Sequence, residues 1–273
     1  MIRFRRGMPV SDVNGVKLYW ERAGSGPRLL FCNGSGSTLA DVQPMLDALA
    51  ARFDLVAWDY RGFAGSGPVT RPYTMAEIAA DVDGLLELVG WETCRVVGVS
   101  FGGMVAQEFA VSHPERVECL ALACTSSGGE GGGSYPLQKL LELPKEESIA
   151  ARLRLVDSRW DNLWFAAHPA DRALAERLTV DRDQLDPAGA AARGAQLEAR
   201  AGHDSWDRLG AVTCPTLVIS GRYDGIAPVE NGRAIASRIR GAEFRSYEGG
   251  HAFLFQDPAA IPELLTFLQA RSG

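Results

Sequence analysis

The segment CRVVGVSFGGM, from Cys94 to Met104, constrains the fold of this chain more than any other feature of the sequence. A short apolar run leads into Ser100, which stands between Gly98 and Gly102, and a helical pattern of apolar residues follows at once. Glycines let a strand and a helix cross closely, because they carry no Cβ atom. We therefore predict a buried strand, a tight turn and a helix whose free N–H groups can face an anion, which is the setting of a nucleophile elbow.

Two residues later in the chain are suitable partners for Ser100. Asp224 follows a predicted buried strand at 216–220, and His251 follows another at 242–247. The carboxyl ends of the strands in an α/β sheet meet at one edge, so the three side chains are expected there together. Taken singly, Asp224 could open a turn and His251 could be an ordinary loop histidine. Together, in the chain order Ser, Asp, His, they favour a catalytic triad.

With these motifs the chain resembles the α/β-hydrolase superfamily, in particular its branch of small esterases, enol-lactonases, haloperoxidase-like perhydrolases and meta-cleavage C–C hydrolases. The resemblance covers about residues 16–125 and 213–269. It implies an α/β fold with a mainly parallel, eight-stranded sheet flanked by helices, and an inserted helical lid. It also implies that Ser100 is the nucleophile, Asp224 the acid and His251 the base, with no cofactor.

The resemblance extends to two further loops. The family's oxyanion turn matches residues 33–36, where Asn33 replaces the usual His. The expected oxyanion donors are the backbone N–H groups of Ser35 and Phe101. A second loop, with a DxRGxGxS-like pattern in which an alanine replaces one glycine, matches at Asp59, Arg61, Gly62, Ala64 and Ser66.

Strand-like and helix-like segments alternate along most of the chain, which indicates a mainly parallel sheet covered on both faces. Asn14 and Gly15 predict a hairpin turn near the amino end. Besides the strand before Ser100, strands are expected at 16–21, 28–32, 54–58, 117–123, 216–220 and 242–247, and helices at about 38–52, 76–88, 229–239 and 259–271.

The middle of the chain lacks strand-like runs and contains only helical segments punctuated by prolines. We therefore predict a core domain at 1–125 and 212–273 and a helical lid at 126–211. The stretch SSGGEGGGS at 126–134 could be a flexible hinge or an exposed linker. Trp160, Trp164 and Phe165 fall on one face of a helix predicted at 160–167. They could line an apolar pocket above Ser100, or pack the lid onto the core, which is the more usual role of that spacing.

Composition narrows the function classes. A net charge of −6 and a pI near 5.3 give no support for binding to nucleic acid or to an anionic membrane. The first residues lack the apolar stretch of a secretory signal, and no run of about 18 apolar residues predicts a membrane span. The five cysteines have no metal-site spacing, so no metal is predicted and we expect reduced thiols in a cytoplasmic protein.

The sequence thus predicts a serine hydrolase that acts through an acyl-enzyme on a small to medium, largely apolar ester or lactone. Its partner would be a small-molecule substrate, and the oligomeric state stays open. C–C bond hydrolysis or perhydrolase activity with the same triad is an alternative, because fold and triad do not fix the substrate. A second alternative, with less support in the sequence, is a small-ligand receptor without catalytic activity. The candidate substrate-binding residues are Asn33, Gly34, Trp160, Trp164 and Phe165.

Overall fold

The computed structural model describes residues 10–179 and 187–270, with a sheet at its centre. The strands are β1 Val10–Val13, β2 Val16–Ala23, β3 Arg28–Cys32, β4 Asp54–Trp58, β5 Cys94–Val99, β6 Val117–Ala123, β7 Thr216–Gly221 and β8 Glu243–Tyr247. Their order across the sheet is β1-β2-β4-β3-β5-β6-β7-β8. Strands β3 to β8 pair in parallel, whereas β2 is antiparallel to both β1 and β4. The predicted eight-stranded, mainly parallel sheet is confirmed.

Both faces of the central strands are buried. Leu30 and Val96 belong to the apolar cluster on one face, whereas Leu29 and Val97 belong to the cluster on the other face. This alternation follows from the period of two residues in a strand. Strands covered on both faces consist of nearly continuous apolar residues, which is why their positions could be read from the sequence.

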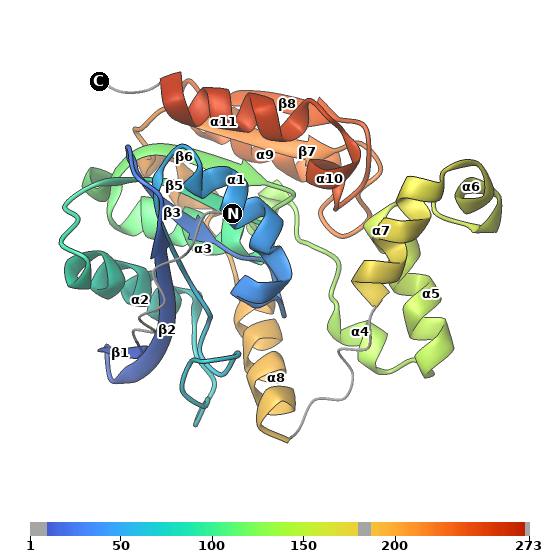
Figure 1. Cartoon of the computed structure of the whole chain (residues 1–273), viewed down its shortest axis with the longest axis horizontal. Coiled ribbons are helices and arrows are strands. Elements are labelled where there is room, and N and C mark those ends of the chain that lie inside the picture. Colours follow the sequence, from blue (N-terminus) through green and yellow to red (C-terminus); the bar gives the residue numbers. More distant parts are fainter. Residues whose placement is uncertain (1–9, 180–186, 271–273) are drawn as a thin grey trace.

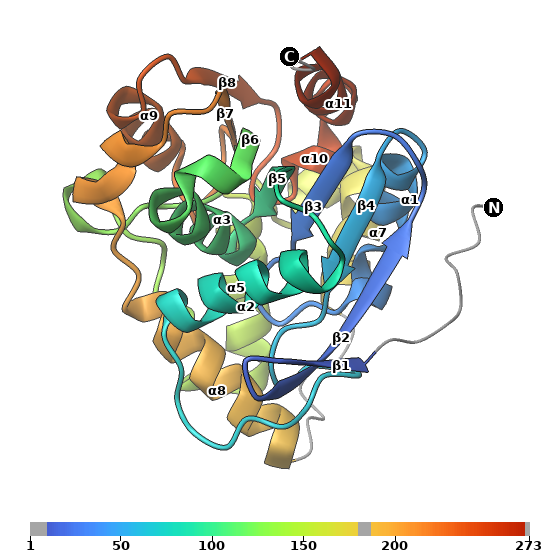
Figure 2. The same cartoon turned by 90° about the vertical axis from the view of Figure 1, so that its left-hand side faces the viewer.

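Helices cover the two faces of the sheet (Figure 1, Figure 2). Helices α2 (Met75–Leu88), α3 (Phe101–Ser112) and α9 (Val229–Arg238) pack on one face. Helices α1 (Gln43–Ala50) and α11 (Ala260–Ala270) pack on the other, with the short α10 (Phe253–Gln256) beside them. The helix expected at about 38–52 is instead a 3-10 turn at Leu39–Val42 followed by α1, which starts anew at its amino-terminal proline, Pro44.

Residues 126–211 form an insertion between β6 and β7, with no strand among its described residues. Helices α5, α6 and α7 gather on one side of the core, and the carboxyl end of α8 returns to it (Figure 1). The described part of the chain contains no helix long and apolar enough to cross a membrane. The helices of the insertion are α4 Gln138–Leu141, α5 Lys145–Val156, α6 Asn162–Ala167, α7 Pro169–Thr179 and α8 Pro187–Ala201.

The two crossings between core and insertion are packed against each other. Ser127 is fully buried, and its carbonyl oxygen accepts a hydrogen bond from the backbone of Ser205 at 2.8 Å. The Ser205 hydroxyl in turn donates to Oε1 of Gln107 at 3.0 Å. Gly128 has a φ of 75°, and a Cβ atom there would overlap the carbonyl oxygen of His203. Residues 126, 127 and 131 of this glycine-rich stretch are buried, whereas 129, 130 and 133 are exposed, so the stretch is an exposed linker only in part. Its tightly packed glycines allow the two crossings to approach each other.

Candidate active site

Ser100 lies on the sharp turn between β5 and α3. Its backbone has φ 57° and ψ −117°, a conformation that a residue other than glycine adopts only at a cost. The core fixes this turn, because Ser100 N donates to Ala123 O and Thr125 Oγ1 donates to Ser100 O, both at 2.8 Å. A Cβ atom at Gly102 would overlap the carbonyl oxygen of Cys32, so α3 can approach β3 only with glycine at this position.

His251 lies between Ser100 and Asp224. Its Nε2 atom is 2.9 Å from Ser100 Oγ, and its Nδ1 atom is 2.7 Å from Asp224 Oδ2. The other carboxylate oxygen of Asp224 accepts the backbone N–H groups of Ile226 and Ala227 at 2.8 and 2.9 Å. Because a carboxylate only accepts, the proton of the neutral imidazole must be on Nδ1. Nε2 is then free to accept the Ser100 proton. The structure thus brings together the three residues predicted as a triad.

The turn at 33–36 lies beside Ser100. A Cβ atom on Gly34 would be 3.8 Å from that of Ser100. The Asn33 side chain closes the turn, because its Oδ1 accepts the N–H of Gly34 at 2.8 Å and its Nδ2 donates to Thr38 O at 3.1 Å. The Asn33 side chain therefore stabilises this turn through two hydrogen bonds, at the position where the family usually has a histidine.

The two expected oxyanion donors lie on the segments next to Ser100. Phe101 is the first residue of α3, so its N–H has no acceptor within the helix. Ser35 follows Gly34 in the turn. The Ser35 hydroxyl is buried and has no hydrogen-bond partner among the described residues. That the backbone N–H groups of Phe101 and Ser35 bind an oxyanion stays a prediction.

The DxRGxGxS-like loop serves to hold this end of the sheet together. Asp59 Oδ1 accepts the N–H of Leu39 at 2.8 Å, and Ser66 Oγ donates to Asp59 O at 2.6 Å. Burial raises the pKa of Asp59 to about 6. Arg61 donates to both carboxylate oxygens of Asp81 on α2, at 2.6 and 2.7 Å. These contacts tie the loop to α2 and to the segment after the oxyanion turn.

The sequence predicted Trp160, Trp164 and Phe165 on one face of one helix. This prediction is wrong, because Trp160 lies outside the helix that carries the other two rings. Helix α6 begins only after Asp161, whose Oδ1 accepts the N–H of Trp164 at 2.7 Å and caps the helix. Trp160 precedes the helix, is 2% exposed and packs against Phe165, with ring centroids 5.6 Å apart. The indole N–H groups of Trp160 and Trp164 both donate to Asp171 Oδ2, at 3.2 and 2.6 Å. These contacts place all three rings in one cluster, and contact with substrate stays a prediction.

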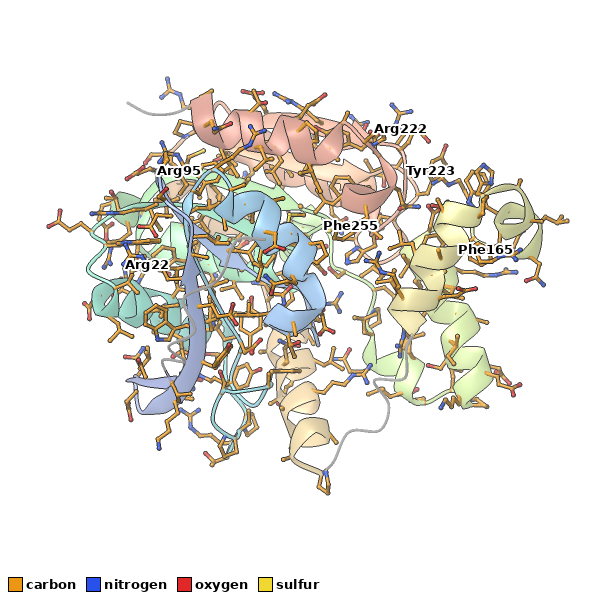
Figure 3. All side chains as sticks on the ribbon, in the orientation of Figure 1. Arg22, Arg95, Phe165, Arg222, Tyr223 and Phe255 are labelled. Atoms are coloured by element: carbon orange, nitrogen blue, oxygen red, sulfur yellow. The ribbon has the colours of Figure 1, made fainter. Side chains whose placement is uncertain are left out.

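Backbone atoms at 155–158, where α5 ends, hold both loops that carry Asp224 and His251. In Figure 3 Tyr223 lies at the edge of the core next to the insertion, and Phe165 lies on the insertion. Through three backbone hydrogen bonds, the insertion helps to fix the distance between Asp224 and His251. The hydrogen bonds are His251 N to Val156 O (2.5 Å), Gly225 N to Leu155 O (2.9 Å) and Ser158 N to Tyr223 O (3.0 Å).

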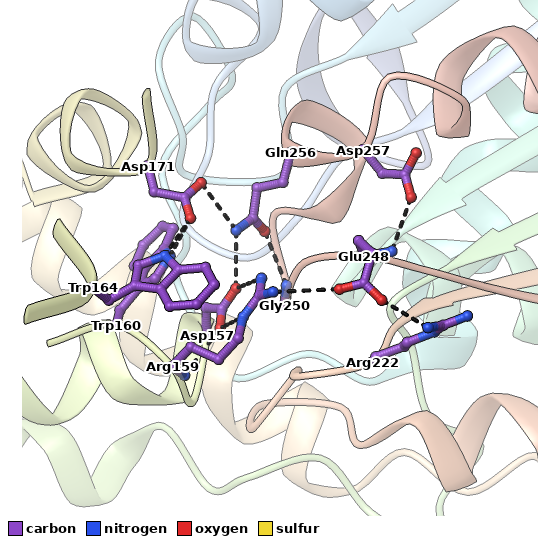
Figure 4. A network of polar contacts seen from close by, with 10 residues as sticks. All are labelled: Asp157, Arg159, Trp160, Trp164, Asp171, Arg222, Glu248, Gly250, Gln256 and Asp257. Atoms are coloured by element: carbon purple, nitrogen blue, oxygen red, sulfur yellow. Dashed lines mark hydrogen bonds and ion pairs between the residues drawn. The ribbon is translucent and has the colours of Figure 1, made fainter. Parts of the chain in front are cut away.

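A polar network continues this junction, and Figure 4 shows Gln256 between two aspartates. Gln256 Oε1 accepts the N–H of Gly250, the neighbour of His251, at 2.9 Å. Gln256 Nε2 donates to Asp157 at 2.9 Å and to Asp171 at 3.4 Å. Arg159 pairs with both oxygens of the fully buried Asp157. Sequence reasoning missed this network, because its members lie far apart in the chain and form no motif.

Sequence reasoning also missed two polar residues of α8. Gln196 Oε1 accepts the N–H of Gly36 in the oxyanion turn at 2.7 Å. Arg200, one helical turn later, donates from Nη1 to Tyr135 O at 2.8 Å. Both are buried and lie on the face of α8 that carries the buried Ala192. The spacing of four residues from Ala192 to Gln196 to Arg200 was the available signal, since it places polar side chains on a buried helix face.

An α/β sheet with a serine at a strand–helix turn, facing a histidine and an aspartate from later loops, defines the class of α/β hydrolases. Sequence comparison agrees. The profile of the alpha/beta hydrolase fold matches residues 27–258, and the chain belongs to the α/β-hydrolase family.

Three similar proteins are hydrolases by name. The poly(3-hydroxyalkanoate) depolymerase of Ectopseudomonas oleovorans is 30% identical over 88% of this chain and 84% of its own length. The 3-oxoadipate enol-lactonase 2 of Acinetobacter baylyi is 25% identical over 86% of this chain and 85% of its own. The solved structure of a hydrolase from Pseudomonas aeruginosa PA01 is 26% identical, with a TM-score of 0.78 over 97% of this chain and 99% of that one. The chain is therefore a hydrolase of this family.

Proposed function

We propose that this enzyme is a serine hydrolase that cleaves a small to medium, largely apolar carboxylic ester or lactone. The observation that carries the proposal is the continuous contact from Ser100 Oγ through His251 to Asp224, at 2.9 and 2.7 Å. A hydroxyl in such a series is activated as a nucleophile. The name of the enol-lactonase relative supports the lactone part of the proposal.

The chemistry follows from the atoms that face one another. His251 Nε2 accepts the proton of Ser100 Oγ as this oxygen attacks the acyl carbonyl, and Asp224 stabilises the imidazolium that forms. The backbone N–H groups of Phe101 and Ser35 bind the oxyanion of the tetrahedral intermediate. His251 then gives its proton to the leaving group. Water, activated by the same imidazole, releases the acid from Ser100 and restores the enzyme.

The proposal assigns the remaining parts of the chain as well. Residues 1–125 and 212–273 are the catalytic core, and residues 126–211 are a lid that sets substrate choice. Gly34 and the cluster of Trp160, Trp164 and Phe165 contact the substrate, and Asn33 acts there by shaping the turn. The backbone contacts of 155–158 with the Asp224 and His251 loops support a lid fixed next to the reacting groups.

Active-site labelling tests the proposal. A fluorophosphonate should add once, at Ser100, and Ser100→Ala should lose labelling and about 10⁶-fold in kcat, as in other triads. Ser112→Ala, at the exposed end of α3, is the matched control and should label like the wild type. Labelling at another residue, or hydrolysis by Ser100→Ala at the wild-type rate, would contradict the assignment. Turnover of p-nitrophenyl esters and lactones, compared with a vinylogous diketone and with peracid formation, distinguishes ester cleavage from its alternatives.

A further inference from the structure

Arg200 is buried with half of its guanidinium unpaired. The residue is 6% exposed and uses Nη1 to donate to Tyr135 O at 2.8 Å. Its Nε and Nη2 atoms are also buried, and neither has a hydrogen-bond partner among the described residues. Burial lowers the pKa of Arg200 to about 10, and the negative charge of Asp224 opposes that shift. The side chain is therefore a cation at neutral pH. A buried cation without an acceptor is costly, so this arrangement needs a reason.

The unpaired atoms are the ones that arginine uses to hold a carboxylate. In Arg22 and Arg61, Nε and Nη2 donate to the two oxygens of Asp54 and Asp81, respectively. Two parallel N–H groups match the two oxygens of a carboxylate, which gives both strength and orientation. Arg200 offers the same edge in a buried place. The described residues supply no carboxylate for it.

The position of Arg200 links it to the reacting groups. On one side Gln196, a turn earlier on α8, is bonded to Gly36 of the oxyanion turn, and its Nε2 is buried and unpaired among the described residues. On the other side Tyr135, which accepts from Arg200, donates its own N–H to Ile226 O in the Asp224 loop at 2.7 Å. Residues four apart on a helix share a face. The two side chains therefore extend from the oxyanion turn to the Asp224 loop.

Two other arginines, the buried Arg95 and the partly buried Arg61, show what a structural role looks like. Arg95 is 4% exposed, yet Nε donates to Leu268 O at 2.8 Å and Nη1 donates to Glu118 at 3.0 Å. Arg61 is paired through both edge atoms with Asp81. Arg200 differs because two more buried polar atoms without a partner among the described residues belong to Gln196, one turn earlier on α8, and to Ser35, the neighbour of Gly36 to which Gln196 is bonded. A polar ligand group would satisfy such atoms, whereas an apolar substrate would leave them unpaired.

We propose that Arg200 and Gln196 form a carboxylate subsite, and that the ester or lactone cleaved at Ser100 carries a second, free carboxylate. This inference rests on the proposed serine hydrolase activity and names its substrate class. The free carboxylate lies on the Nε–Nη2 edge of Arg200 and accepts a further hydrogen bond from Gln196 Nε2. The reactive carbonyl lies between Ser100 and the oxyanion donors.

Paired substrates test the subsite. One series consists of monoesters of four- to seven-carbon dicarboxylic acids, and the second of butyryl esters of ω-hydroxy acids, so that the carboxylate lies in the acyl group or in the leaving group. Each is compared with its neutral methyl amide. The wild type should prefer the charged member of at least one series by tenfold or more in kcat/KM. Arg200→Met should lower kcat/KM for that member by about 100-fold and leave the neutral member within threefold.

Two further variants separate charge from geometry. Arg200→Lys keeps the charge but loses the two-donor edge, so it should lose about tenfold on the charged substrate. Arg28→Met removes an exposed arginine at the amino end of β3, the opposite edge of the sheet, and should keep the wild-type preference. If Arg200→Met does not fold, the charged-over-neutral preference of the wild type and its loss in Arg200→Lys still test the subsite. Absence of any preference in the wild type would overturn the subsite.

A binding measurement separates failure of the subsite from failure of the proposed chemistry. Calorimetric titration of Ser100→Ala with monomethyl glutarate and monomethyl adipate should give binding that weakens tenfold or more when Arg200→Met is added. Phosphonate labelling at Ser100 with neither carboxylate preference nor carboxylate binding would overturn the subsite and leave the serine hydrolase standing. Arg200-dependent binding without labelling or hydrolysis would support the subsite and overturn the serine hydrolase.

Discussion

The sheet alone holds Ser100, whereas Asp224 and His251 depend on both the sheet and the insertion. The Ser100 turn is fixed by close backbone contacts to β3 and β6, and a single Cβ atom at Gly102 would disrupt them. The loops of Asp224 and His251 are instead hydrogen-bonded to residues 155–158, and the His251 loop also donates to Gln256, which binds Asp157. The nucleophile is thus set by steric fit within the core, and its partners by polar contacts across the junction.

This difference predicts which changes are local and which are not. Substitutions on the core side should remove chemistry without altering the lid, and substitutions at the junction should weaken the alignment of the partners by degrees. Misplacement of a reacting group by about 1 Å can cost about 10²-fold in rate, so even a small relaxation at the junction is measurable.

Asp224→Asn should lose about 10²–10⁴-fold in kcat and fold normally. The amide oxygen can keep the backbone hydrogen bonds of Ile226 and Ala227, so the loop stays in place. The amide group no longer selects the imidazole tautomer with the proton on Nδ1, which is the reason for the loss. Steady-state hydrolysis and a melting curve measure the two effects. Asp207→Asn, at an exposed acid, is the control. A loss below about threefold would point to a different acid.

Trp164→Ala should change the selectivity between short and long acyl chains by about 10–200-fold, the range for small apolar differences in a pocket. Labelling of Ser100 should survive, because Ser100, Asp224 and His251 lie outside the insertion. Leu163→Ala, at the exposed neighbour on α6, is the matched control. The competing interpretation is packing, since Trp164 stacks on His168 at 3.7 Å and donates to Asp171. A lower melting temperature with unchanged selectivity would favour packing.

Gln256→Leu should lower kcat by about tenfold with little change in KM. The variant removes the acceptor of Gly250 N and one donor to the buried Asp157, so the His251 loop loses alignment and not its contact with substrate. The rate of phosphonate labelling should fall in parallel, because it needs the same activation of Ser100. Gln269→Leu, on the surface of α11, is the control. Unchanged kcat and labelling would show that the sheet alone aligns His251.

The difference between the sheet and the insertion also explains which parts of the fold and of the site could be predicted from the sequence. The strands at 28–32, 54–58 and 117–123 were predicted with the observed bounds, because runs buried on both faces leave little choice of structure. Ser100 and Asp224 were found because each follows such a strand, and His251 because it follows the partly buried β8. The structure brings these three residues together, and their catalytic roles stay predictions.

The insertion was harder to predict. Its helices were expected, but Asp161 moves the start of α6 beyond Trp160, so the rings do not share one helix face. The glycines at 128–132 were interpreted as part of a flexible hinge or an exposed linker, whereas a Cβ atom at Gly128, Gly129 or Gly131 would overlap the returning chain. Arg200 and Gln256 form contacts between segments far apart in sequence. Their roles depend on tertiary packing, which propensity and spacing do not encode.

The last prediction concerns stability, not rate, at the crossing where the chain returns to the core. Burial lowers the pKa of His203 to about 4, well below its usual value near 6.5. Between these values the unfolded chain binds a proton that the folded protein does not, so the free energy of unfolding falls as the pH decreases from about 6.5 to 4.

His203→Gln removes the proton that residue 203 takes up on unfolding, and with it this pH dependence of the free energy of unfolding. The wild type should therefore lose about 2–3 kcal/mol relative to the variant over that pH range. Urea unfolding at several pH values measures the difference, and other titrating groups, such as Asp59, are common to both proteins and cancel. His113→Gln, at the partly exposed end of α3, controls for loss of an imidazole. Parallel stability curves for the wild type and His203→Gln would show that the crossing admits a charged imidazole and is not the closed junction that its buried contacts indicate.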